Sequence, residues 1–205
     1  YKRQIVLEVF DDSVKPMNQL ANTVEKIIGE ILVEYGTRSS ILLIGRYNYD
    51  MYKLYRTGCF SELPGGLVKS KKYPNANITF MTAHSSKGLG YDNVILINMI
   101  EGKFDFPCQI EDDPIIKLVT YEDKSMPFAE ERRLFYVAMT RTNPRVYIAA
   151  PKTKPSRFLI ELIKYFNIPH RDDINMHAVD LFNLRCPRCG FPLKYEFNKN
   201  YGLNL

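Results

Sequence analysis

The stretch "TFMTAHSSKGLGYDNVILINM" (Thr79–Met99) decides the fold, because it reads as two buried β-strands separated by a long polar interruption. The apolar run that ends at Met81 and the run Val94–Ile97 flank the eleven residues "TAHSSKGLGYD". A tight hairpin uses about two to five turn residues, so the two runs are not the arms of one hairpin. We expect two strands of one sheet joined by a loop that displays polar side chains.

The rest of the sequence alternates between strand and helix patterns. We predict strands over 4–10, 40–46, 77–83, 93–99 and 145–150, and helices over 16–35, 48–60, 129–141 and 156–166. This alternation predicts an α/β fold with a parallel sheet flanked by helices. Ligands of such sheets bind beyond the carboxyl ends of the strands, where the 82–92 loop begins. The alternative is an ordinary polar surface loop.

Composition sets wide limits on function. The 205 residues are 45% hydrophobic and 25% charged, which is typical of a soluble globular chain with one substantial core. No apolar run reaches the roughly 18 residues of a membrane span, so no membrane partner is expected. The chain starts at Tyr1 without an export signal and enters a strand at once, as a piece of a longer polypeptide would. The net charge of +5 permits a polyanionic partner without demanding one.

A second informative stretch is "EERRLFYVAMTRTNPRVYIAAP" (Glu130–Pro151), whose predicted helix ends on Arg141. We expect Arg141 to point toward the same sheet edge as the 82–92 loop. A guanidinium on a rigid helix end suits phosphate, because it is always charged and engages two oxygens at once. The alternative is a simple partner of the helix dipole.

These segments together resemble a known family. "TFMTAHSSKGLGYDNVIL" resembles motif V, and "EERRLFYVAMTRT" motif VI, of the UvrD/Rep-like superfamily 1 DNA helicases. "ILLIGRYN" is similar to the family's earlier strand-plus-arginine segment, and "PSRFLIELI" to its closing helix. "EGKFDFPCQIEDDP" and "CPRCG" are most similar to the helicase IV-type branch. The resemblance covers residues 1–166 in matching order and implies the second RecA-like domain of such an enzyme.

The resemblance also implies roles for single residues. Arg141 matches the motif VI arginine that reaches the γ-phosphate of ATP on the other RecA-like domain, where it acts as an arginine finger. Thr82 and His84 match motif V residues that face single-stranded DNA, and Ser85 and Lys87 belong to the same segment. Hydroxyl and imidazole groups can bond phosphate or sugar oxygens without reading bases.

One position departs from the family pattern. The family usually reads "KGLE", with the glutamate holding the ribose of ATP, whereas this chain has Gly90 at that place. Gly90 therefore leaves the ribose contact in doubt, and Asp92 is the nearest carboxylate that could replace it. Gly90 also supports an alternative function, a degenerate RecA-like domain that acts as a non-catalytic DNA-binding or protein-docking module. Retention of Arg141 and His84 argues against that alternative.

Two expected parts of such an enzyme are absent from the sequence. Only Ser61–Asn77 occupies the place of the large accessory domain, which we expect to be missing or reduced to a basic loop. No P-loop occurs, since "GGLVKS" (Gly65–Ser70) has Val68 where glycine is required. The chain could then supply only half of an ATP site. The P-loop and the Mg²⁺ ligands would lie on the N-terminal RecA-like domain of the same protein.

The implied function is that of an ATP-dependent helicase that translocates 3′ to 5′ on single-stranded or partly duplex DNA in the bacterial cytosol. A helicase subunit of a recombination nuclease is a further possibility, although no nuclease carboxylate cluster occurs.

The C-terminal tail differs in kind from the rest of the chain. We divide the chain into a motor domain over 1–166, a linker over 167–184 and a truncated zinc ribbon over 185–205. Cys186 and Cys189 have the CxxC spacing of a zinc knuckle, but tetrahedral Zn²⁺ needs four ligands. The tail therefore predicts a zinc half-site that is completed beyond Leu205, with a redox CxxC as the weaker alternative.

Overall fold

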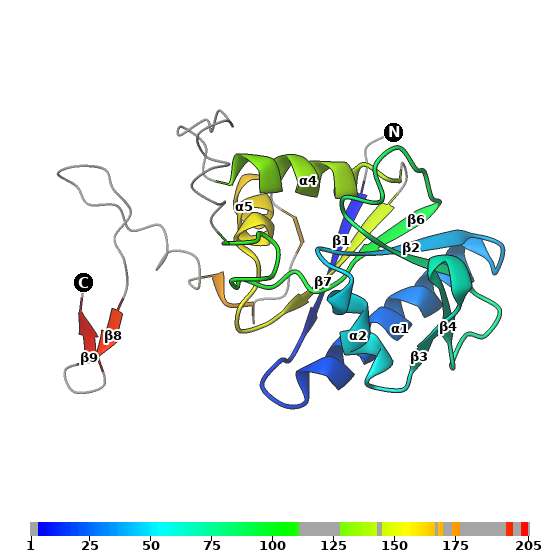
Figure 1. Ribbon diagram of the computed structural model, residues 1–205, viewed down its shortest axis with the longest axis horizontal. Helices are drawn as coiled ribbons and strands as arrows, with labels where there is room; N and C mark the ends of the chain where they lie inside the picture. The colour runs from blue at the N-terminus through cyan, green and yellow to red at the C-terminus, as the bar shows by residue number, and fades with distance from the viewer. Residues whose placement is uncertain are drawn as a thin grey trace.

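The computed structural model describes residues 4–110, 128–142, 145–166, 168–169, 174–176, 196–198 and 202–204. Its centre is a seven-stranded sheet in the order β1-β7-β6-β2-β5-β4-β3 (Figure 1). The strands are β1 (Gln4–Phe10), β2 (Ser40–Gly45), β3 (Phe60–Glu62), β4 (Leu67–Ser70), β5 (Asn77–Thr82), β6 (Asn93–Leu96) and β7 (Arg145–Pro151).

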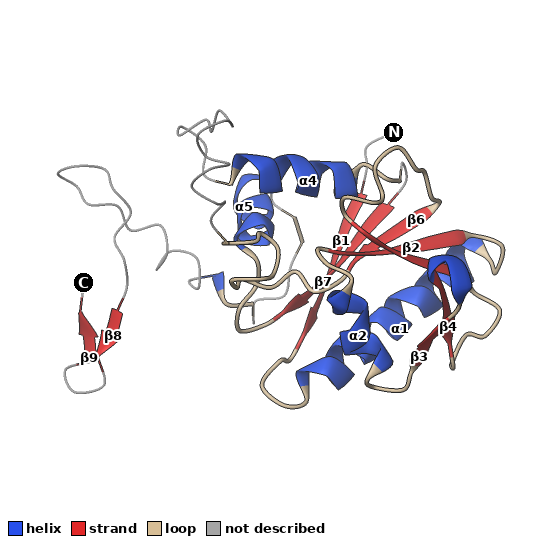
Figure 2. Cartoon of the chain, viewed as in Figure 1, coloured by secondary structure: helices blue, strands red, loops and turns tan. Residues whose placement is uncertain are grey.

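Helices cover both faces of the sheet (Figure 2). The helices α1 (Pro16–Tyr35) and α2 (Tyr49–Tyr55) lie on one face, and α4 (Ala129–Met139) and α5 (Arg157–Phe166) on the other. Strand β2 serves both layers: Leu42 and Ile44 pack toward α4 and α5, while Ile41 and Leu43 pack toward α1 and α2. A strand buried on both faces reads as a continuous apolar run, and this confirms the predicted α/β sandwich.

Helix α1 shows how local sequence sets the bounds of an element. Pro16 occupies the first turn, where its missing N–H costs nothing. Apolar residues at helical spacing, from Leu20 to Ile31, are buried against the sheet. The helix ends at Gly36, which has φ 81° and donates its N–H to the carbonyl oxygen of Leu32 at 3.0 Å. The observed bounds are those predicted from the sequence.

Five strands run parallel and give the sheet two distinct edges. Strand β2 pairs in parallel with β5 on one side and with β6 on the other. We call the side where β1, β7, β6, β2 and β5 end the carboxyl edge, and the side where they begin the amino edge. The 83–92 loop leaves β5 at the carboxyl edge and enters β6 at the amino edge, so one loop spans both.

The basic loop expected at Ser61–Asn77 is instead a β-hairpin. Strand β4 pairs antiparallel with both β3 and β5 and so extends the sheet. Val68 and Ser70 are buried while Lys69 between them is exposed, which is the period-two pattern of a strand. Because Lys69 lies within a strand, "GGLVKS" is not a P-loop, whose lysine begins a helix.

The C-terminal tail contributes only a small described element. Strands β8 (Glu196–Asn198) and β9 (Gly202–Asn204) form an antiparallel pair. Cys186 and Cys189 lie outside the described residues, as does most of the predicted linker. Within the described ranges, no helix combines the length and the apolar character that crossing a membrane requires.

Candidate functional site

The 83–92 loop begins at the carboxyl edge with a compact turn. The hydroxyl oxygen of Thr82 lies 2.9 Å from that of Ser85 and accepts the Ser85 N–H at 3.2 Å. Ser86 is buried and donates its hydroxyl to the carbonyl oxygen of Ala83 at 2.9 Å. These bonds hold the turn while leaving His84 and Ser85 exposed. The polar groups predicted to face DNA therefore lie side by side on the surface.

Arg46, which follows β2, supports this turn from the neighbouring strand. Its Nη1 lies 3.4 Å from Nδ1 of His84. Its Nη2 and Nε donate to the carboxylate of Glu131, in the first turn of α4, at 2.6 and 3.0 Å. Glu131 also accepts the N–H of Cys108 at 3.0 Å. This bidentate pair neutralises Arg46 and fixes α4 to the carboxyl edge.

A buried carboxylate holds the backbone on which Arg46 sits. Asp50 has no exposed surface and accepts the N–H groups of Arg46 and Tyr47 at 2.8 and 3.0 Å. Its other oxygen accepts Nδ2 of Asn98 at 2.6 Å and lies 3.4 Å from the ammonium of Lys53. Burial raises the pKa of Asp50, because desolvation disfavours the charged form. Asp50 gives no signal in the sequence, since one aspartate in a short helix does not stand out before its burial is known.

Arg141 lies at the other end of the loop. Helix α4 runs from the carboxyl edge, where Glu131 sits, to the amino edge, where β7 begins. Arg141 follows that helix, and its carbonyl oxygen accepts the N–H of Tyr91 at 2.9 Å. Arg141 thus contacts the last residues of the loop and not Thr82 or His84. We predicted that Arg141 and the loop lie at the same edge of the sheet. This is correct only for the end of the loop, because the loop crosses from the carboxyl edge to the amino edge.

The guanidinium of Arg141 is held by neutral oxygens. Nε donates to the carbonyl oxygen of Val137 at 2.8 Å, Nη2 to the hydroxyl of Thr140 at 3.0 Å, and Nη1 to the carbonyl oxygen of Leu89 at 3.3 Å. Within the part of the chain that the structure describes, none of its acceptors is a carboxylate. These hydrogen bonds hold the guanidinium in place, and no carboxylate among them neutralises its charge. An anion-binding group requires both features.

Gly88 and Gly90 of the loop differ in the reason for a glycine. Gly88 has φ 84°, the left-handed conformation that explains a glycine at this point. Gly90 is exposed, and a Cβ built there would meet no atom within 4 Å, so the space that a glutamate would use is open. Lys87 is exposed, as expected of a phosphate contact.

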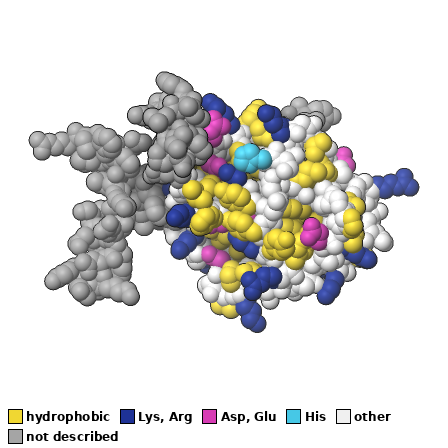
Figure 3. All heavy atoms as spheres, in the orientation of Figure 1, with side chains coloured by type: hydrophobic (Ala, Val, Ile, Leu, Met, Phe, Trp, Pro, Cys, Tyr) yellow, Lys and Arg dark blue, Asp and Glu magenta, His cyan; other side chains and the backbone are white. Residues whose placement is uncertain are grey.

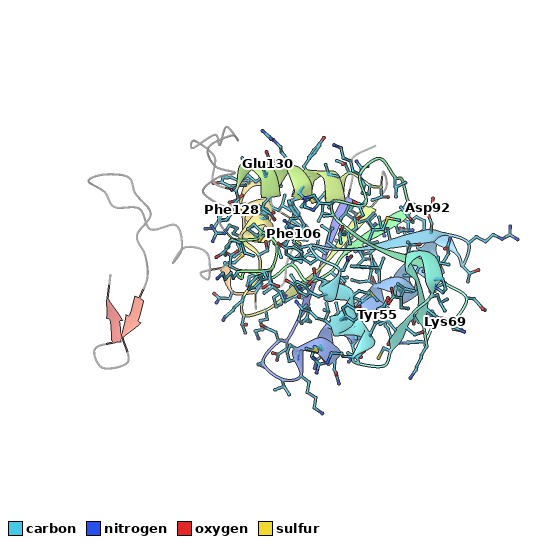
Figure 4. All side chains as sticks on the ribbon, viewed as in Figure 1. Tyr55, Lys69, Asp92, Phe106, Phe128 and Glu130 are labelled. Carbon is cyan, nitrogen blue, oxygen red and sulfur yellow. The ribbon has the colours of Figure 1, made fainter. Side chains whose placement is uncertain are left out.

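Asp92, the carboxylate nearest to Gly90, has a structural partner. Its Oδ2 accepts both the N–H and the hydroxyl of Ser40 at 2.8 Å, and these bonds lower the pKa of Asp92. The side chain pins the end of the loop to the start of β2. Figure 4 shows Asp92 at the opposite end of the sheet from Phe106 and Phe128.

The site contains no metal centre within the described ranges: no three His, Cys, Asp or Glu side chains there are grouped to hold an ion. Cys186 and Cys189 fall outside those ranges. No donor set for Zn²⁺ or Mg²⁺ therefore belongs to the described site.

The segment that carries this site matches a known protein family. Residues 64–153 match the family model of the UvrD-like helicase C-terminal domain. DNA helicase IV of Escherichia coli K12 is 31% identical over 157 residues, which is 76% of this chain and 23% of that protein. ATP-dependent DNA helicase PcrA of Staphylococcus epidermidis is 36% identical over 95 residues, which is 42% of this chain and 12% of that protein.

A solved structure of the C-terminal domain of a possible DNA helicase from Lactobacillus plantarum WCFS1 also matches, with a TM-score of 0.46 and 15% identity over 77% of this chain and 78% of that one. The chain spans less than a quarter of the length of the two curated relatives described above. The matched residues 64–153 contain the whole 83–92 loop and Arg141, and this part of the chain is a UvrD-like helicase C-terminal domain.

Proposed function

We propose that the chain is the second motor domain of an ATP-dependent DNA helicase or translocase that moves 3′ to 5′ along single strands. The observation that carries the proposal is the 83–92 loop, which joins an exposed polar turn at the carboxyl edge to Arg141 at the amino edge. A single loop that contains the proposed DNA contacts and also touches Arg141 can couple DNA binding to ATP hydrolysis.

Arg141 is proposed as the arginine finger. Phosphoryl transfer develops negative charge on the transferred oxygens, and a pre-positioned guanidinium stabilises that charge without reorganising. The hydrogen bonds of Arg141 to neutral oxygens supply the positioning and leave the charge to act on phosphate. ATP and Mg²⁺ would be held mainly by the P-loop domain of the same protein. The open space at Gly90 leaves the ribose without a carboxylate from this position.

Thr82, His84, Ser85 and Lys87 are proposed as contacts to the DNA backbone. Their hydroxyl, imidazole and ammonium groups can donate to phosphate oxygens, and none of these contacts depends on base identity. His84 and Ser85 are exposed at the carboxyl edge, where α/β sheets bind their ligands, and Lys87 is exposed farther along the same loop. We propose that the protein acts on DNA in the cytosol.

The test is DNA-stimulated ATP hydrolysis by a protein that joins this domain to its P-loop domain. We expect single-stranded DNA to raise the steady-state rate, and His84→Ala to raise the DNA concentration needed for half-maximal stimulation. A protein with an intact P-loop domain whose ATP hydrolysis does not respond to DNA would contradict the proposal and favour a docking module.

A further inference from the structure

Aromatic side chains gather at the carboxyl edge, next to the polar turn. The rings of Tyr47 and Tyr49 stack with their centroids 5.4 Å apart and their planes at 15°. Tyr49 donates its hydroxyl to the carbonyl oxygen of Phe104, which joins α2 to the segment after β6. We call Tyr47, Tyr49 and Phe104 the aromatic surface. Hydrophobic side chains cluster on the face shown in Figure 3, where α2 and the segment after β6 lie in front of the sheet.

Two of these rings are open to solvent and accompanied by cations. Tyr49 is 38% exposed and Phe104 52% exposed. The ammonium of Lys103 lies 5.8 Å from the Phe104 ring centroid. That of Lys53 lies 5.4 Å from the Tyr49 ring centroid, but it also pairs with the carboxylates of Asp50 and Asp105 at 3.4 and 3.5 Å. Exposed rings with the cation Lys103 beside them fit a polyanion that carries flat bases, and single-stranded nucleic acid is the partner with that chemistry.

The aromatic surface is rigidly supported from beneath. The hydroxyl of Tyr47 donates to Sγ of Cys108 at 3.0 Å, and burial raises the pKa of Tyr47 to about 12. The buried carboxylate of Asp50 fixes the N–H of Tyr47 at 3.0 Å. Rings that are ordered before binding lose little conformational entropy when a base stacks on them.

One arginine connects the aromatic surface to the proposed DNA contacts. The guanidinium carbon of Arg46 lies 4.4 Å from the Tyr47 ring centroid, and its Nη1 lies 3.4 Å from Nδ1 of His84. We infer that bases of the strand whose phosphates contact His84 stack on Tyr49 and Phe104. This inference rests on the proposed function. It adds base stacking, which tolerates any sequence, to the proposed contacts with the DNA backbone.

Two fluorescent single strands of equal length distinguish base stacking from backbone contact. One is oligo(dT), and the other is a fully abasic strand with the same number of phosphates. We expect the 205-residue chain to bind oligo(dT) more tightly, by about fivefold or more, because stacking adds to the backbone contacts. Phe104→Leu and Tyr49→Leu should reduce that preference while leaving abasic affinity unchanged. Tyr49→Phe keeps the ring and should retain the preference.

Tyr35 provides a matched control. It is also 38% exposed and has a cation, Arg145, 6.0 Å from its ring centroid, but it ends α1 at the amino edge. Tyr35→Leu should leave both affinities unchanged. Equal binding of the two strands by the wild type, or an unchanged preference in variants that melt normally, would overturn the stacking inference alone. Failure to bind either strand would overturn the DNA contacts of the proposed function as well.

Discussion

Two arginines at opposite edges of the sheet have the same guanidinium group but different surroundings, and the surroundings assign them different roles. Arg46 at the carboxyl edge and Arg141 at the amino edge are both partly buried and held by several hydrogen bonds. Arg46 donates to the carboxylate of Glu131, whereas the acceptors of Arg141 within the described residues are two carbonyls and a hydroxyl. A guanidinium paired with a carboxylate joins elements of the fold. A guanidinium held by neutral groups keeps its charge for a ligand.

The largest effect is expected from Arg141 in a protein that contains both motor domains. Arg141→Ala should reduce DNA-stimulated ATP hydrolysis by about 10³–10⁵-fold while nucleotide binding stays largely intact, because the charge acts on the transition state. Arg141→Lys should recover little, since an ammonium lacks the planar fork. Steady-state rates are measured beside melting temperatures. A variant that melts normally and hydrolyses ATP within a few-fold of the wild type would remove Arg141 from the mechanism.

Arg46 should show the reverse pattern, a loss of stability. The side chains of Arg46 and Glu131 are 12% and 14% exposed, so removing either leaves its partner nearly buried and unpaired. We expect Arg46→Ala or Glu131→Ala to lower the free energy of unfolding by about 3 kcal/mol. Arg141→Ala should cost less, about 1–2 kcal/mol, because it removes hydrogen bonds to neutral oxygens and leaves no buried carboxylate unpaired. Urea denaturation of the three variants measures this contrast, and equal losses would erase the distinction between the two arginines.

The proposed DNA contacts of Lys87 and His84 should differ in how strongly they depend on salt. The isolated chain should bind single strands weakly and without sequence preference, with an affinity that falls steeply with salt. Lys87→Ala should reduce the slope of log affinity against log salt by about 0.7, because one phosphate contact is lost. His84→Ala should weaken binding a few-fold, with a smaller change in slope than Lys87→Ala. Fluorescence anisotropy at several salt concentrations tests both, and nanomolar, sequence-dependent binding at physiological salt would contradict them.

Asp92 should give a smaller, pH-dependent effect at the amino edge. Its hydrogen bonds from Ser40 lower its pKa below the ordinary 3.8, so the stabilisation is present above that pH and is lost as the pH falls through the lowered pKa. The difference in melting temperature between the wild type and Asp92→Ala should be constant near pH 6 and shrink toward pH 2.5. A difference that grows on acidification would show that the carboxylate does not act through these bonds.

The smallest signal is expected from the C-terminal cysteines, which we propose form half of a zinc site. Two thiolates cannot complete a tetrahedral shell, so metal analysis of the 205-residue chain should find well under one Zn²⁺ per molecule. Stoichiometric zinc would reveal two further ligands, and His177→Ala would then be the first variant to examine.

Local patterns predicted most of the helices and strands, but not how the segments between them are arranged. The period of apolar residues located α1 and the core strands, because burial on one or both faces leaves a regular signature. The β3–β4 hairpin is not evident from the sequence, because the lysines around Val68 and Ser70 mask the strand alternation. The residue types in the 83–92 loop and at Arg141 indicated phosphate chemistry without showing which ends of the loop and helix meet.

The sequence by itself determined the α/β class, the positions of most helices and strands, and the two segments that carry the family resemblance. These follow from interactions between residues close along the chain and from short patterns of residue type. Only the tertiary structure showed that one loop crosses the sheet, that Glu131 neutralises Arg46 across 85 positions, and that Asp50 is buried beneath the aromatic surface. Pairing and burial decide which charges remain available to a ligand, and both depend on how distant segments pack.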